Sequence, residues 1–189
     1  MNPAHEDDRS NRVKLILSAQ AAGPEGLRSE FPKLPREETQ RRFTEALHHA
    51  ADEVFEMMVG TALGTSDQAT LPRVADYTAM IGLAGDLCGV LSFRCSNETA
   101  GQIAGRMLGT DEITSAECIR DALGEICNMV AGSFKAQVSD VAAQCMLSVP
   151  TVVSGKDYEL FPLVDGLRIQ IARSFEGALV WITLDLHGC

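Results

Sequence analysis

The sequence has no apolar run long enough to cross a membrane and no concentration of positive charge. Its hydrophobic stretches fall short of the ~18 to 20 residues that a membrane-spanning helix needs. Lysine and arginine number 16 against 26 aspartates and glutamates, and the formal net charge is −10. Nucleic-acid-binding proteins usually carry a basic stripe, whereas the basic residues here are scattered among acids. We therefore expect neither a membrane nor a nucleic acid as partner.

The six cysteines lack the spacing of a metal site. None belongs to a CxxC pair or has a histidine at ligand spacing, which are the patterns of zinc sites. Five of the six lie in apolar runs, where a free thiol packs like a small hydrophobe. We expect reduced thiols rather than disulfides or a bound metal. The first residues, MNPAHEDDRSNRVK, also lack the basic-then-apolar layout of a signal peptide, so the expected location is the cytoplasm.

The composition that remains is that of one globular domain with an extension. Of the 189 residues, 46% are hydrophobic and 22% charged, which is ordinary globular composition. A domain of ~150 residues buries enough surface to fold without disulfides or a bound metal. Residues 1–38 contain four of the seven prolines and one short apolar stretch, residues 13–19, which could be a docking strand or a transient helix. We expect a flexible extension over 1–38 and a folded domain over 39–189.

The order of the periodic segments predicts an α+β fold. Apolar residues recur at helical spacing in three segments and alternate in others. Pro150 indicates an edge strand or a bulge. The expected elements are a helix over 37–60, a hairpin over 77–96, a helix over 97–109, a helix over 115–141, a strand over 146–155 and a hairpin over 167–186. Because strands and helices are grouped, an antiparallel sheet packed with helices is favoured over a doubly wound parallel sheet.

The long helix over 115–141 carries a carboxylate and an amide on its polar face. Glu125 and Asn128 are three residues apart, so their Cβ atoms lie ~5 to 6 Å from each other. Gly124 and Gly132 flank them toward the polar side, although an interior glycine costs a helix ~1 kcal/mol relative to alanine. Close approach of a second backbone is the usual reason for such glycines. The pattern alone leaves open a solvated face or a docking face.

The stretch DALGEICNMVAGSFK, residues 121–135, resembles the motif D-x-x-G-E-x-x-N-M-x-x-G of the CheC/CheX/FliY phosphatases of bacterial chemotaxis, and its CheX branch in particular. The context is similar in the same order. FTEALHHAADEVFEMM resembles the family's first helix, AMIGLAGDLCGVLSF its glycine-containing hairpin, TAGQIAGRMLG its short helix and LSVPTVVSG its next strand. The resemblance covers about residues 41–187. It implies a CheC/CheX-like single domain in which one long helix carries the E-x-x-N motif.

The resemblance implies a phosphatase that removes the phosphoryl group from the phospho-aspartate of a CheY-like response regulator. In the family, the long helix docks against the receiver domain of the regulator. Asn128 would orient a water for in-line attack on phosphorus, and Glu125 would pair with a lysine of the partner. An amide both donates and accepts hydrogen bonds but is too weak a base to take a proton. The residues expected to contact the partner around this pair are Asp121, Gly124, Gly132 and Lys135.

The same resemblance implies that this chain binds no cofactor, because Mg²⁺ would sit on the response regulator. A homodimer is expected, since CheX-type proteins commonly dimerise through sheet edges. The CheC branch repeats the motif on its first helix, but here that face has Asp52, Glu53 and Glu56 with no asparagine three residues after a glutamate, so one active helix is expected. The alternative is a CheX-like domain that binds or localises a response regulator without catalysis.

Overall fold

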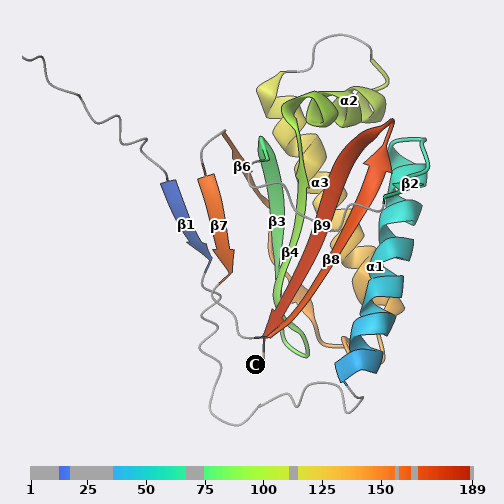
Figure 1. The fold of residues 1–189 in the computed structure, drawn as a ribbon, viewed down its shortest axis with the longest axis vertical. Coiled ribbons are helices and arrows are strands. Elements are labelled where there is room, and N and C mark those ends of the chain that lie inside the picture. Colours follow the sequence, from blue (N-terminus) through green and yellow to red (C-terminus); the bar gives the residue numbers. More distant parts are fainter. Residues whose placement is uncertain are drawn as a thin grey trace, which may run out of the picture.

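A seven-stranded antiparallel sheet with helices α1 and α3 across one face forms the body of the protein (Figure 1). The computed structural model describes residues 13–17, 36–66, 75–110, 115–155, 158–162 and 166–187. The helices are α1 (Arg36–Met58), α2 (Asn97–Leu108) and α3 (Ala116–Gln137). The strands are β1 (Val13–Leu17), β2 (Gly64–Thr65), β3 (Tyr77–Ala84), β4 (Cys88–Cys95), β5 (Met146–Leu147), β6 (Thr151–Ser154), β7 (Tyr158–Pro162), β8 (Leu167–Phe175) and β9 (Ala178–His187).

The sheet is made of two hairpins joined side by side. Its strand order is β2-β8-β9-β4-β3-β5, and β6 also pairs with β3. Strand β4 joins the hairpins by pairing with β9, with Arg94 opposite Trp181. A separate parallel pair, β1 with β7, is linked to the sheet where the Tyr158 hydroxyl lies 2.7 Å from Thr78 Oγ1. The predicted α+β class with an antiparallel sheet of hairpins is confirmed.

Local sequence signals explain where the helices begin and end. Ser96 caps α2 by accepting a hydrogen bond from the backbone N–H of Thr99, and Gly109 ends it in the left-handed conformation, with φ of 65°. Ser115 caps α3 in the same way. Helix α3 ends at Gln137, before the expected residue 141. Pro150 interrupts the predicted strand, which is divided into β5 and β6 at the edge of the sheet, as proline without an N–H requires.

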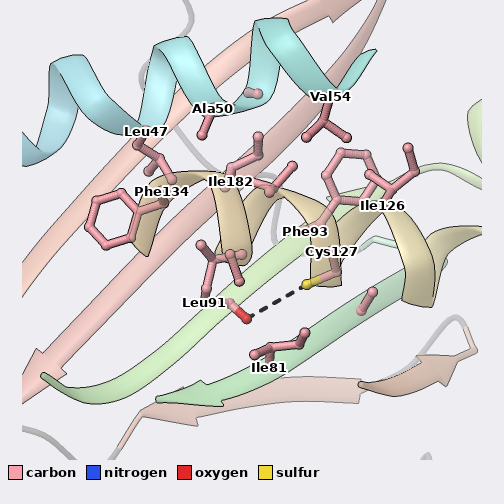
Figure 2. Packing of buried hydrophobic residues seen from close by; sticks show 14 of the residues in the cluster. Leu47, Ala50, Val54, Ile81, Leu91, Phe93, Ile126, Cys127, Phe134 and Ile182 are labelled. Carbon is pink, nitrogen blue, oxygen red and sulfur yellow. Dashed lines mark hydrogen bonds between the residues drawn. The ribbon is translucent and has the colours of Figure 1, made fainter. Parts of the chain in front are cut away.

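Aromatic side chains hold the two long helices on the sheet. The ring of Phe55 on α1 lies 5.9 Å from that of Phe93 on β4 and 5.7 Å from that of Phe175 on β8. Phe43 on α1 meets Phe134 on α3 edge-to-face at 5.6 Å. Figure 2 shows α1 and α3 sending apolar side chains into this shared core. Each such buried side chain contributes ~1.5 to 3 kcal/mol, so the position of α3 is firmly fixed.

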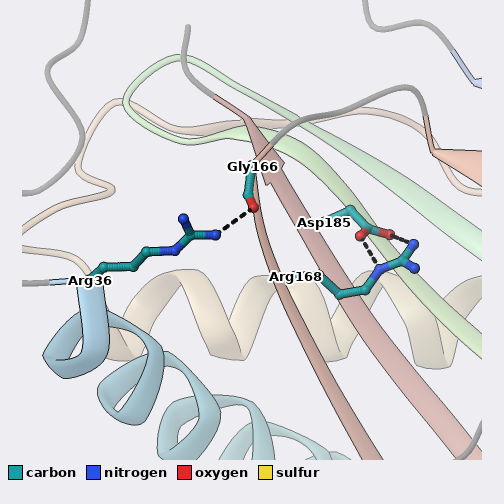
Figure 3. A network of polar contacts seen from close by, with 4 residues as sticks. All are labelled: Arg36, Gly166, Arg168 and Asp185. Carbon is teal, nitrogen blue, oxygen red and sulfur yellow. Dashed lines mark hydrogen bonds and ion pairs between the residues drawn. The ribbon is translucent and has the colours of Figure 1, made fainter.

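Polar contacts anchor the ends of the elements, as Figure 3 shows. The guanidinium of Arg36, at the start of α1, donates to the Gly166 carbonyl at 3.1 Å. Across the β8–β9 hairpin, Arg168 donates to both carboxylate oxygens of Asp185, at 2.6 and 3.1 Å. Gly166 must be glycine, because a Cβ there would lie 1.7 Å from the carbonyl oxygen of Leu186.

Two sequence-based expectations bear on residues that are only partly described: the flexible extension over 1–38 and the reduced state of the cysteines. Within the expected flexible extension over 1–38, residues 13–17 form β1 and residues 36–38 already belong to α1; its other residues lie outside the described ones. Cys88 is disulfide-bonded, so the expectation of reduced thiols is wrong for Cys88. Disulfide partners are set by the tertiary fold, and local spacing does not reveal them. Cys95, Cys118, Cys127 and Cys145 are free, as expected.

Candidate docking face on helix α3

Helix α3 presents one buried stripe and one outward stripe. The buried stripe packs on the sheet and on α1 and consists of Ile119, Ala122, Leu123, Gly124, Ile126, Cys127, Val130, Ala131 and Phe134. Helical periodicity in the sequence predicts an apolar side made of Ile119, Ala122, Leu123, Ile126, Val130, Phe134 and Val141. The first six are buried as predicted, and Val141 lies beyond the end of α3. Asp121 and Glu125 are exposed, while Asn128, Gly132 and Lys135 are half-buried.

Asp121, Glu125, Asn128 and Gly132 form a polar row along the outward stripe, with Lys135 beside its far end. They follow one another at intervals of three and four residues, so they share one side of the helix. Within the described segments of the chain, the side chains of Glu125 and Asn128 form no hydrogen bond or ion pair. Their polar atoms are therefore available to a partner rather than used by the fold.

The two glycines of the motif have different surroundings. A Cβ at Gly132 would have no atom within 4 Å, so internal packing does not require glycine there. Gly124 is buried, and a Cβ there would lie 3.6 Å from side-chain atoms of Pro150 and Val152. Gly124 therefore lies on the covered side of α3, because Pro150, just before β6, and Val152 on β6 pack over it, and its expected part in docking stays a prediction. Only Gly132 leaves helix backbone uncovered beside Asn128.

On one side of the polar row, hydrogen bonds join α3 to α1. Ser133 Oγ donates to a carboxylate oxygen of Glu53 at 2.5 Å, and Gln137 Nε2 donates to Ser133 Oγ at 3.2 Å. Gln137 Nε2 also lies 2.9 Å from His49 Nδ1. As the residue number increases along α1, from His49 to Glu53, the number of the bonded residue on α3 decreases, from Gln137 to Ser133. The two helices therefore run antiparallel.

The neighbouring acidic residue of α1 is also held by an internal partner. Arg173 on β8 is only 8% exposed, and it donates to the Leu63 carbonyl at 2.8 Å and to His48 Nδ1 at 3.0 Å. It also forms an ion pair with Asp52. Burial, together with the charge of Arg173, lowers the pKa of His48. This network links α1, β8 and Leu63, which directly precedes β2. The sequence hints at it only by placing an arginine at an inward-facing position of β8.

On the other side of the polar row, the segment over residues 144–150 is tied to the β3–β4 hairpin. The backbone N–H of Gln144 donates to Asp86 at 2.7 Å. Gly82 and Ser148 exchange two bonds: the Gly82 N–H donates to Ser148 Oγ, and the Ser148 N–H donates to the Gly82 carbonyl, each at 2.9 Å. The segment ends at Pro150, against Gly124. Sequence reasoning did not associate this segment with the site.

Among the described residues, no group of three or more histidine, cysteine, aspartate or glutamate side chains is arranged to hold a metal ion. None of the described helices is long and apolar enough to cross a membrane.

The sheet of two joined hairpins with two long helices on one face defines a CheC/CheX-like fold. A CheC-like superfamily protein from Shewanella sp. PV-4 superposes with a TM-score of 0.68 at 25% identity, covering 78% of this chain and 98% of that one. CheX from Desulfovibrio desulfuricans gives 0.68 at 22% identity, covering 77% and 99%. CheX in the CheX–CheY–BeF₃–Mg²⁺ complex from Borrelia burgdorferi gives 0.61 at 18% identity, covering 77% and 97%.

The sequence identifies the family within this fold. The pattern of the family Chemotaxis phosphatase CheX matches residues 77–171, which is half of the chain. The chain belongs to the CheX family. It is also 28% identical over 123 residues to the CheY-P phosphatase CheX of Thermotoga maritima, across 63% of this chain and 79% of that protein. The family resemblance inferred from the motif and its context is confirmed.

Proposed function

We propose that this chain dephosphorylates the phospho-aspartate of a CheY-like response regulator, in chemotaxis or a related two-component pathway, with helix α3 as the docking element. The observation that carries the proposal is the pair Glu125 and Asn128, which lies on the outward stripe of a firmly packed helix without partners in the described residues. Membership of the CheX family supports it, and so does the relative from Thermotoga maritima, which is a CheY-P phosphatase.

Asn128 positions the attacking water in the proposed mechanism. An acyl phosphate is already reactive, and phosphoryl transfer needs positioning and charge neutralisation more than covalent help. The amide of Asn128 can accept a hydrogen bond from a water and donate another to a phosphoryl oxygen, which holds the water in line with phosphorus. Fixing a reactant in such a geometry removes much of the entropic part of the barrier.

The other residues of the row bind the partner. Glu125 would pair with a lysine next to the phosphoryl group, and Asp121 and Lys135 would contact the receiver domain beside it. Gly132 lets the partner approach the helix backbone closely, because it has no side chain in an open position. The divalent ion is expected on the regulator, as the Mg²⁺ in the Borrelia burgdorferi CheX–CheY complex suggests. A homodimer remains a prediction, and sedimentation velocity of the free protein tests it.

The test is a time course of phosphate loss from phosphorylated receiver domains. Wild type should shorten the lifetime of its cognate phosphorylated receiver, and Asn128→Ala should not, although it still binds that receiver. Gln102→Ala is the matched control, because Gln102 is an exposed amide on α2, away from the row; this variant should behave as wild type. Equal phosphate-loss rates with wild type and Asn128→Ala would contradict the role of Asn128. Binding by wild type without any change in lifetime would identify a non-catalytic binding module instead.

A further inference from the structure

Large apolar side chains border the polar row of α3. In the described part of the chain, the exposed large hydrophobic residues are Met57 (63% exposed), Leu108 (57%), Met146 (68%) and Val149 (82%). Single exposed apolar residues are ordinary on a protein surface. Here, however, Met57 is on α1, which is hydrogen-bonded to one side of α3, and Val149 directly precedes Pro150, which packs over the other side at Gly124. Leu108 lies at the end of α2.

Val149 stands beside the row on a backbone that is held in place. It directly precedes Pro150, whose side chain lies 3.6 Å from where a Cβ at Gly124 would be. Gly124 is one helical turn before Asn128. The Ser148 hydroxyl donates to the Val149 carbonyl at 2.8 Å and accepts from the backbone of Gly82 at 2.9 Å. The Val149 side chain is thus exposed to solvent on a segment whose backbone is held by hydrogen bonds and therefore loses little entropy when a partner binds.

Met57 occupies the corresponding place on the α1 side. The antiparallel register of the two helices pairs His49 with Gln137 and Glu53 with Ser133. One further turn along each helix brings Met57 toward Met129, the neighbour of Asn128 in the sequence. Met129 is half-buried and packs against the core, so the register predicts a fixed apolar side chain of α3 on the side toward Met57.

We propose that Met57 and Val149 form an apolar border that contacts the receiver domain on either side of its phosphorylated aspartate. This inference rests on the proposed function and deepens it by separating binding from chemistry. The occupant is the receiver domain because the border is continuous with the row that enters its phosphorylation site. Apolar contacts around a polar centre exclude water from it, which leaves the water held by Asn128 as the nucleophile. The border therefore sets affinity, and Asn128 sets the rate of the chemical step.

The test compares three substitutions of exposed apolar residues: Met57→Ser, Val149→Ser and, as matched control, Leu108→Ser. Each is titrated with the receiver domain activated by beryllium fluoride and Mg²⁺, and KM and kcat are then measured with the phosphorylated receiver. Met57→Ser and Val149→Ser should each weaken binding about tenfold, as expected for losing the burial of one aliphatic side chain, and should raise KM by the same factor with kcat unchanged. Leu108→Ser should match wild type. The loss should persist at high salt, because apolar contacts are not screened.

Failure of this inference is distinguishable from failure of the proposed function. If Met57→Ser and Val149→Ser bind like Leu108→Ser while Asn128→Ala still abolishes turnover, the border is overturned and the function stands. A fall in kcat without a rise in KM would likewise overturn it. If sedimentation shows that Met57→Ser or Val149→Ser dissociates a wild-type dimer, the border is a contact between copies and the inference is wrong. If wild type binds no activated receiver, both the function and the border are refuted.

Discussion

Helices α1 and α3 lie antiparallel on the same face of the sheet, yet they use their polar side chains differently. On α1, Asp52 pairs with Arg173 and Glu53 accepts a hydrogen bond from Ser133. On α3, Glu125 and Asn128 form no such contacts within the described residues. Asp52 and Glu53 on α1 hold the fold together, whereas Glu125 and Asn128 on α3 remain available to a partner. A polar residue on a well-packed helix that its own protein leaves without a partner is the better candidate for function.

The largest effect on stability is expected from the α1 side of this comparison. Arg173→Ala removes the donor to Asp52, His48 and the Leu63 carbonyl, and it should lower the free energy of unfolding by ~2 to 3 kcal/mol. Urea denaturation followed by circular dichroism measures the change. Glu125→Ala is the comparison on α3, and its unfolding free energy should stay within ~0.5 kcal/mol of wild type. Equal destabilisation by both variants would contradict the division of roles.

A smaller effect is expected at the two glycines of α3. Gly132→Ala should raise the free energy of unfolding by up to ~1 kcal/mol, because helix propensity improves and a Cβ there meets no atom within 4 Å. The same variant should weaken binding of an activated receiver domain, since the added methyl group stands where the partner approaches.

Gly124→Ala provides the matched control for Gly132→Ala. Its Cβ would make ordinary contacts with Pro150 and Val152 at 3.6 Å, inside the protein, so receiver binding should not change. If Gly132→Ala binds the receiver as tightly as Gly124→Ala does, close approach of the partner at Gly132 is ruled out.

The smallest effect concerns the pH dependence contributed by His48. Burial and Arg173 lower the pKa of His48 in the folded protein, while Asp52 opposes the shift. The unfolded chain therefore binds the proton more tightly than the folded one. Stability is unaffected by His48 above its ordinary pKa of about 6.5 and decreases as the pH falls through that value toward the folded pKa. Urea denaturation at pH 7.5 and 5.5 should show a larger loss for wild type than for His48→Asn, whose amide oxygen can still accept from Arg173. An equal loss in both proteins would show that another group is responsible.

Local signals were sufficient to predict much of the fold. The caps at Ser96 and Ser115 and the stop at Gly109 depend on residues within one helical turn, so the sequence displays them directly. The apolar stripe of α3 was predictable for the same reason. Pro150 indicated an edge strand or a bulge, and β5 and β6 on either side of it lie at the edge of the sheet.

Features that depend on distant segments were missed. Strands β1 and β7 pair residues about 145 positions apart. Strand β2 has only two residues, which is too few to show the alternation of apolar and polar residues that predicts a strand. The inward position of Arg173 and the cover of Pro150 over Gly124 arise only when β8 and β6 pack against the helices. The motif located the candidate site, but its two flanks, the 144–150 segment and Met57, are brought to α3 by the tertiary structure.

The most direct test of the central claim is a single-turnover measurement with Asn128→Asp. This variant keeps the size and shape of the side chain but replaces the amide donor with a carboxylate, which only accepts hydrogen bonds and repels phosphoryl oxygens. At saturating variant, with binding of the receiver domain checked separately, the rate of phosphate loss should fall about 100-fold or more, as when one positioned transition-state donor is removed. A rate within about twofold of wild type would contradict the claim that the Asn128 amide positions the water.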